Sequence, residues 1–279
     1  FNAREQVSFY EGQRGSVGLE WAERGPDNVG GRTRAILVDI LDTTGNTVYA
    51  GSVAGGLFKS LNGGATWLPI NDHSLAPAIS CIDQGTNGTI YVGTGSSFES
   101  FDGSGSSGMI GMGMYKSTDG ENFELLPVTI PTPTNSTGAD WTNINAIAVD
   151  PTNDERVFAA TKQGLMLSSN GGTTWECAAN NVVGQCVGSV QDVKIAPDGT
   201  VMMVTGGLVM VSADGSVGSF ELATGSSTPG GQRTVIQYST NGDTAWAFSV
   251  TGGHIRGLYR SADKGYTWSL AQGPVTNTW

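Results

Sequence analysis

The segment that decides the fold is Ser60-Leu61-Asn62-Gly63-Gly64-Ala65-Thr66-Trp67, because the same pattern returns later in the chain. It reappears as Ser168-Ser169-Asn170-Gly171-Gly172-Thr173-Thr174-Trp175 and as Ser261-Ala262-Asp263-Lys264-Gly265-Tyr266-Thr267-Trp268. Two degenerate copies, Ser117-Thr118-Asp119-Gly120 followed by Phe123 and Ser212-Ala213-Asp214-Gly215 followed by Phe220, lie between them. The copies begin 44 to 57 residues apart, and self-similarity at roughly this period indicates a repeat architecture.

Each copy of this turn motif lies within the same larger unit, which consists of four short runs of alternating apolar residues. In the first unit the expected strands are 34–39, 47–52, 56–60 and 66–70, and the motif joins the third strand to the fourth. Alternation with a period of two is typical of strands. The repeated unit predicts an all-β protein, a β-propeller of four-stranded antiparallel blades. Five blades are visible in this chain, and they could belong to a larger propeller.

The repeated units predict the domain organisation. Residues 1–32 are expected to form an N-terminal extension that could supply a closing strand, and residues 33–279 the propeller. Either the five blades close on themselves, or further blades follow Trp279. We favour further blades, since an exposed sheet edge in an intact protein is an aggregation hazard. The blades are expected at 33–70, 78–127, 142–177, 188–222 and 233–271.

The chemistry of the turn motif explains its repetition. Its Asp or Asn can accept hydrogen bonds from nearby backbone N–H groups, and its glycine supplies the positive φ that a tight hairpin needs. The Trp at its end offers a large apolar face to a neighbouring sheet. The motif residues are therefore expected to be structural: Ser60, Asn62, Gly64, Trp67, Ser117, Asp119, Ser168, Asn170, Gly172, Trp175, Ser212, Asp214, Ser261, Asp263, Gly265 and Trp268.

The pattern S-x-D-x-G-x-T-W resembles the Asp-box, or BNR repeat, of propellers in the sialidase and sortilin-like superfamily. This resemblance implies the propeller fold but little about activity, since enzymes, receptors and assembly factors share the scaffold. The stretch from Trp21 to Ile36 is similar to the opening of secreted Bacteroidetes propeller proteins, many of them cell-surface proteins or type IX secretion cargo. It implies a secreted or cell-surface location, with further domains of the same polypeptide as neighbours.

Composition and charge exclude two classes of function. The 279 residues include 14 Lys and Arg against 25 Asp and Glu, a formal net charge of -11. Such a surface repels phosphate backbones, so general nucleic-acid binding is excluded. No run of residues approaches the roughly 18 consecutive apolar residues of a membrane span, so no membrane insertion is expected.

The cysteines and histidines predict a disulfide and no metal site. Cys177 and Cys186 are nine residues apart in a connection rich in Asn and Gly. They form a loop disulfide if the chain is extracellular, and are two buried thiols otherwise. Cys81 lies in an apolar run and is expected to be a buried small hydrophobic residue. His73 and His254 are the only histidines, and no Cys or His pair has zinc-site spacing, so no metal and no cofactor is expected.

The residues that differ between repeats are the candidates for a binding site. The start of each innermost strand is expected to face the mouth of a central channel, where varied polar side chains could form a ring, or could contact only water and one another. The insertion 95–111, rich in Gly and Ser, adds apolar anchors on the same face. The candidate ligand-binding residues are Arg34, Asn145, Asp192, Arg233, Phe98 and Phe101, with Ala78 at the matching position of the second blade.

Two classes of function remain. The first is a non-catalytic recognition or spacer module of a larger secreted protein, which binds a protein or a glycan on the loop-rich face. The alternative is a glycoside hydrolase, sialidase-like or active on β-glucans, with an arginine cluster or two carboxylates at the channel mouth. Asp39, Asp83 and Asp150 recur at the ends of innermost strands and are expected to be turn residues. Only Asp192 breaks the repeat, so we favour the non-catalytic module and assign no catalytic residue.

Overall fold

The computed structural model describes residues 32–70, 78–95, 109–131, 141–180 and 186–273. The chain divides into two units, Phe1–Gly31 and Arg32–Trp279, and all described residues belong to the second. The expected N-terminal extension therefore lies outside the described residues, apart from its last position. The described part is all-β, and its one helical element is a single 3-10 turn at Pro127–Thr129.

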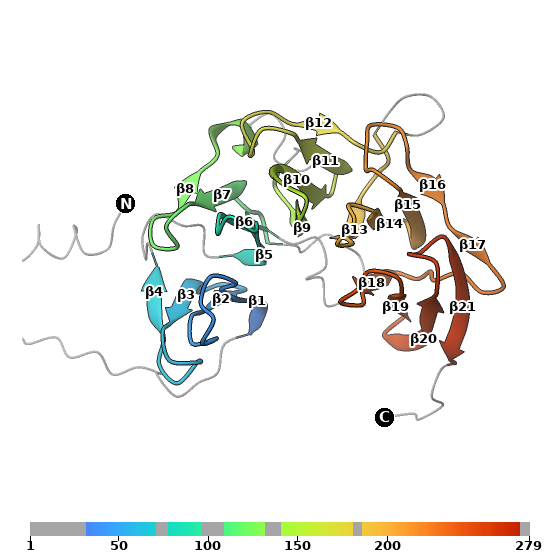
Figure 1. The fold of residues 1–279 in the computed structure, drawn as a ribbon, viewed down its shortest axis with the longest axis horizontal. Helices are drawn as coiled ribbons and strands as arrows, with labels where there is room; N and C mark the ends of the chain where they lie inside the picture. Colours follow the sequence, from blue (N-terminus) through green and yellow to red (C-terminus); the bar gives the residue numbers. More distant parts are fainter. Residues whose placement is uncertain (1–31, 71–77, 96–108, 132–140, 181–185, 274–279) are drawn as a thin grey trace, which may run out of the picture. The chain divides into compact units, whose positions relative to one another are not determined.

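Five sheets follow one another along the chain, each built of four antiparallel strands that pair in sequence order (Figure 1). The fifth sheet gains one short strand, which pairs in parallel with the last strand. This architecture confirms the predicted fold class. The strands are β1 (Thr33–Val38), β2 (Val48–Ser52), β3 (Gly56–Ser60), β4 (Leu68–Ile70), β5 (Ile79–Gln84), β6 (Ile90–Thr94), β7 (Met114–Ser117), β8 (Glu124–Leu125), β9 (Ile144–Asp150), β10 (Asn153–Thr161), β11 (Leu165–Ser168), β12 (Glu176–Cys177), β13 (Val190–Ile195), β14 (Val201–Thr205), β15 (Leu208–Ser212), β16 (Glu221–Leu222), β17 (Thr224–Gly225), β18 (Arg233–Tyr238), β19 (Ala245–Thr251), β20 (His254–Ser261) and β21 (Thr267–Gln272).

The turn motif forms the hairpin between the third and fourth strands of a sheet. In the first sheet the Ser60 hydroxyl accepts a hydrogen bond from the Gly64 N–H at 2.9 Å, and Asn62 Oδ1 accepts one from the Thr66 N–H at 2.8 Å. Gly64 has a φ of 90°, which favours glycine. Because these bonds hold the turn through residue 66, the fourth strand begins at Leu68 and not at residue 66 as expected.

Four hydrophobic cores lie between the five sheets, one at each junction. Successive side chains of a strand point to opposite faces. On β14, Val201 and Met203 lie in the core shared with the third sheet, whereas Met202 and Val204 lie in the core shared with the fifth. The first strands of the five sheets, β1, β5, β9, β13 and β18, are the innermost strands. Each of them contacts the next one in chain order. A middle sheet is therefore apolar on both faces and needs a neighbour on each side.

The aromatic residue at the end of the turn motif packs on the preceding sheet. Trp268 of the fifth sheet is only 2% exposed and shares a core with Met202 of the fourth. Phe123 of the second sheet meets Tyr49 of the first edge to face, with ring centres 6.3 Å apart. Trp175 of the third sheet lies in the core that it shares with the second. The motif therefore joins sheets as well as strands.

We expect Ser261→Ala to destabilise the fold, because it removes the acceptor of the buried Gly265 N–H, which donates to the Ser261 hydroxyl at 2.8 Å. The free energy of unfolding should fall by about 1–3 kcal/mol in a denaturant titration. Ser269→Ala, at an exposed position of the same sheet, is the control and should change it by less than about 0.5 kcal/mol. Equal effects of the two substitutions would contradict the structural role of the motif serine.

Candidate binding site on the innermost strands

A pocket of about 250 Å³ lies where the innermost strands of all five sheets meet. Strands β1, β5, β9, β13 and β18 each contribute side chains to its wall, so it gathers residues from the whole length of the described chain. The lining residues are Arg34, Ala35, Ile36, Ser80, Cys81, Ile82, Asn145, Ala146, Ile147, Gln191, Asp192, Lys194, Arg233 and Val235.

A β-bulge directs one polar side chain from each of the first four innermost strands into this pocket. The register of β1 against β2 passes over Arg34, and the same irregularity recurs at Ser80, Asn145 and Gln191. A bulge leaves one residue unpaired in the ladder and re-aims its side chain. Arg233 takes the matching position in β18, where it pairs regularly with Val250. The repeat therefore presents five polar side chains of four kinds at one place.

The structure corrects the expected ring at two positions. Ala78 precedes β5 and is not a lining residue, and Ser80 takes its place. Asp192 does line the pocket, but its neighbour Gln191 occupies the bulge. The expected set holds only if every innermost strand is regular, and a bulge changes which residue of the strand faces the pocket.

Hydrogen bonds tie polar residues of the innermost strands to the following sheet. The Gln191 side chain donates to the Gln232 carbonyl at 2.8 Å and accepts from the Thr234 N–H at 2.9 Å. Asn145 donates to the Val190 carbonyl at 2.7 Å. These contacts pair backbone groups that a strand at the edge of its own sheet does not pair within the ladder. The ring thus fastens neighbouring sheets as well as lining the pocket.

Two carboxylates fasten sheets in the same way. Asp192 Oδ2 accepts a hydrogen bond from the Ile236 N–H at 2.9 Å, and Asp83 Oδ2 accepts one from the Val149 N–H at 2.7 Å. Burial raises the pKa of both carboxyl groups, and the backbone donors oppose this rise. Both side chains are therefore engaged in contacts between sheets.

Asp39, Asp83 and Asp150 do not share one role. The carboxylates of Asp39 and Asp150 each accept the N–H of the residue two positions on, which makes them turn residues. The turn role expected for Asp83 is wrong, because Asp83 pairs with Tyr91 inside the β5–β6 ladder rather than beyond its end. That register aims its carboxylate across to the third sheet.

The pocket has a positive charge balance in an acidic protein. Arg34, Arg233 and Lys194 line it, against Asp192 as the one carboxylate among its described lining residues. Lys194 Nζ lies 3.5 Å from Asp192 Oδ1. Burial lowers the pKa of Lys194, but nearby acidic groups, chiefly the carboxylates of Asp192 and Asp83, together more than offset this and hold the pKa above its ordinary value. Burial and the charge of Arg233 lower the pKa of Arg34 to about 10. Cations gathered in a partly dehydrated pocket favour an anionic ligand.

The sequence analysis missed three polar lining residues, Ser80, Gln191 and Lys194. Lys194 did carry a signal, because it is a charged residue in a mostly apolar run, two positions from Asp192 and so on the same strand face. Ser80 and Gln191 carried no such signal, since apolar alternation does not reveal a bulge.

Two other expectations concern aromatic anchors and metals. Phe98 and Phe101 lie outside the described residues, so their part in binding stays a prediction. Within the described ranges, no group of three or more His, Cys, Asp or Glu is placed to hold a metal ion.

Cys81 lies in the pocket wall, and burial raises the pKa of its thiol to about 12. We expect it to react slowly with iodoacetamide at about pH 8, where roughly one thiol in ten thousand would be ionised, and the thiolate is the nucleophile. The rate should rise about tenfold per pH unit toward that pKa, measured by mass spectrometry. The urea-unfolded chain is the control, and equally fast alkylation of the folded chain would contradict this assignment.

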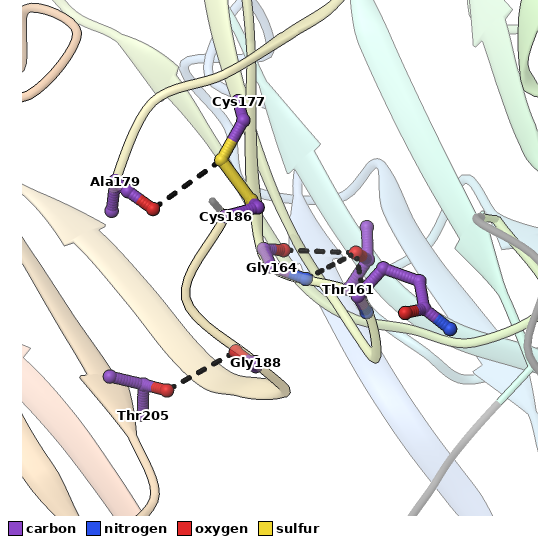
Figure 2. Close-up of a disulfide and its surroundings, with 8 residues drawn as sticks. Thr161, Gly164, Cys177, Ala179, Cys186, Gly188 and Thr205 are labelled. Carbon is purple, nitrogen blue, oxygen red and sulfur yellow. Dashed lines mark hydrogen bonds between the residues drawn. A yellow bond between two sulfur atoms is a disulfide. The ribbon is translucent and has the colours of Figure 1, made fainter. Parts of the chain in front are cut away.

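Cys177 and Cys186 form a disulfide (Figure 2). In the same connection the Val187 N–H donates to the Ala179 carbonyl at 2.9 Å. Gly164 lies against the bridge, and a Cβ at that position would come within 2.2 Å of Cys186 Sγ. Only glycine therefore fits beside this disulfide. Disulfides persist in oxidising surroundings, as in secreted proteins.

The disulfide is expected to stabilise the fold. Replacing both cysteines, Cys177→Ser with Cys186→Ser, should lower the free energy of unfolding by about 2–3 kcal/mol, the loop-entropy value for a closed loop of about ten residues. A denaturant titration with and without a phosphine reductant measures this. The reductant should reproduce the loss in the unmodified chain and leave the double variant unchanged, and no loss in either experiment would contradict the expectation.

No known protein family and no curated protein matches the sequence. Solved structures do match its fold. An ancestral GH74 enzyme matches with a TM-score of 0.62 at 20% identity, over 88% of this chain and 31% of its own. YCF48 bound to D1 peptide matches with a TM-score of 0.54 at 18% identity, over 91% and 70%. The extracellular domain of a hybrid two-component system from B. thetaiotaomicron matches with a TM-score of 0.58 at 12% identity, over 92% and 32%.

These similarities show that the fold is a β-propeller. At such identities they show the fold alone. The chain spans about a third of the length of the GH74 enzyme and of the B. thetaiotaomicron protein. In the part of the chain that the structure describes, no helix has the length and apolar character needed to cross a membrane.

Proposed function

We propose that this chain is a recognition module of a secreted or cell-surface protein, and that it binds a protein or glycan through a carboxylate held in the inner pocket. The observation that carries this proposal is the gathering of Arg34, Arg233 and Lys194 around one pocket of a protein with a net charge of -11. A guanidinium binds a carboxylate through two parallel hydrogen bonds. The volume of about 250 Å³ suits one acidic group of a larger ligand.

The positions of the carboxylates favour binding over glycoside hydrolysis. A hydrolase generally needs one carboxyl group to protonate the leaving group and a second to act as nucleophile or base. Asp192 is bonded to the Ile236 N–H and pairs with Lys194, and Asp83 is bonded to the Val149 N–H. A hydrolase is the alternative function, because GH74 enzymes share this fold.

Several features support use as a secreted recognition module. The disulfide between Cys177 and Cys186 suits an oxidising compartment. The turn motif resembles the Asp-box of sialidase and sortilin-like propellers, and the stretch from Trp21 to Ile36 resembles the opening of secreted Bacteroidetes propeller proteins, many of which are cell-surface proteins or type IX secretion cargo. YCF48, a protein of this fold, has been solved with a bound peptide. We infer that a similar scaffold here presents a peptide or glycan site within a larger polypeptide.

Arg34→Gln and Arg233→Gln are each expected to weaken binding of a carboxylate ligand about tenfold or more, since a charge-assisted hydrogen bond contributes about 1.5–3 kcal/mol. Calorimetry would compare peptides that end in a free carboxylate with their amides, and sialylated or uronic-acid oligosaccharides with their methyl esters. Arg260→Gln, which removes a guanidinium from β20 outside the pocket lining, is the matched control, and all three variants are compared in the 279-residue chain.

Two outcomes would contradict this proposal. The first is equal binding of acid and ester, or an equal effect of all three arginine substitutions. The second is turnover of chromogenic sialosides or β-glucans that Asp192→Asn abolishes while the melting temperature is kept, which would establish the hydrolase instead.

A further inference from the structure

The far face of the fifth sheet is apolar and exposed. On β19, Ala245 and Ala247 lie in the core shared with the fourth sheet, whereas Trp246 and Phe248 point the other way and are 36% and 37% exposed. On β14 of the fourth sheet, by contrast, four successive residues are buried and both faces are covered. We call Val235, Trp246, Phe248 and Arg260 of the fifth sheet the open face.

The first sheet exposes the opposite kind of face. Ile36 and Val38 of β1 are exposed, and Trp67, at the end of its turn motif, is 40% exposed. The corresponding Trp175 and Trp268 pack on the sheet that precedes their own. The first sheet therefore exposes the face that a preceding sheet covers elsewhere in the chain. The fifth sheet exposes the face that a following sheet covers elsewhere.

At the first three of the four junctions between described sheets, a cation lies over an aromatic ring and contacts the next turn motif. Lys59 and Tyr49 are cross-strand partners, with Nζ 5.4 Å from the ring centre, and Lys59 donates a hydrogen bond of 3.2 Å to the carbonyl of Gly120 in the second sheet's motif. The next two junctions repeat this contact, with Lys116 over Tyr91 donating to the carbonyl of Gly171 and Arg156 over Phe158 donating to the carbonyl of Asp214.

The fifth sheet has a similar pair of a cation and an aromatic ring on its open face. Trp246 and Arg260 are cross-strand partners on β19 and β20, as Tyr49 and Lys59 are on β2 and β3. Arg260 directly precedes the motif serine, as Lys59 does, and its guanidinium carbon lies 5.9 Å from the Trp246 ring centre. Tyr49, beneath the next turn motif, is 1% exposed, against 36% for Trp246. The pair on the fifth sheet therefore matches the first junction in position and chemistry.

We propose that the open face docks a further four-stranded blade of the same repeat, supplied by the same polypeptide, and that Arg260 donates a hydrogen bond to a carbonyl of that blade's turn motif. The aromatic residue of that motif would pack over Phe248 and Trp246, as Trp268 packs on the fourth sheet. The blade that precedes the first sheet would cover Trp67 in the same way.

The space and the chain length favour a blade over other occupants. Both β1 and β18 line the inner pocket, so few sheets fit between the first and the fifth, whereas a second copy of this chain would bring five. Residues 1–31 are fewer than those from Val190 to Leu222, which build the shortest described sheet. The docked blade is therefore expected to come from polypeptide beyond these 279 residues.

Alkylation of a single introduced cysteine tests this proposal. Phe248→Cys places a thiol on the open face, and Leu208→Cys places one at an exposed position of β15, outside the open face, as the matched control. In the 279-residue chain we expect both thiols to react at similar rates. In the polypeptide as its natural source makes it, the thiol at position 248 should react at least about tenfold more slowly, while the control is unchanged.

Each other outcome overturns the proposal. Equal rates in the natural polypeptide would show that no blade covers the face. Protection already present in the 279-residue chain would identify a second copy if dilution removes it, or the chain's own N-terminal segment if deletion of residues 1–31 removes it. Arg260→Gln gives an independent measurement. It should lower the melting temperature of the natural polypeptide and not that of the 279-residue chain. An unchanged melting temperature in both would show that Arg260 takes no part in the contact.

Discussion

The structure depends on the burial of both faces of each sheet by its neighbours. Side chains alternate along every strand, so the four apolar residues of β14 divide equally between two cores. A single small sheet with two apolar faces is not stable in water, and its burial requires a sheet on either side. In the second to the fifth sheets, the aromatic residue of the turn motif packs on the sheet before its own.

The most recognisable residues of the chain are thus separate from those that form the site. The turn motif repeats because every sheet needs the same hairpin and the same contact with its neighbour. The pocket, by contrast, is lined where the repeats differ. Asn145 and Gln191 combine both functions, since they face the pocket and also bond to the backbone of the following sheet. A ligand at this site would therefore contact residues that also hold neighbouring sheets together.

The charge distribution gives the pocket a local field opposite to that of the whole protein. An acidic ligand would meet a net repulsion at long range, but salt at physiological strength screens charges beyond about 8 Å. Inside the pocket, Arg34 is partly buried, so salt screens its charge less than that of an exposed group, and the exposed Arg233 adds a second guanidinium to the lining. The local cations therefore dominate at contact, and the acidic surface selects against ligands such as nucleic acids that carry many phosphates.

The sequence by itself determined the strands, the hairpins and the fold class, because alternation and turn chemistry depend on residues close together in the chain. It also predicted Arg34, Asn145, Asp192 and Arg233 as residues at the mouth of the channel, since these positions differ between the repeats, and all four line the pocket. The tertiary structure alone decided that Ser80 and Gln191 complete the ring and that Asp83 reaches the third sheet. The reason is physical. A bulge depends on the register between two strands, and a hydrogen bond between sheets depends on how residues distant in the chain pack together. A local sequence pattern predicts neither.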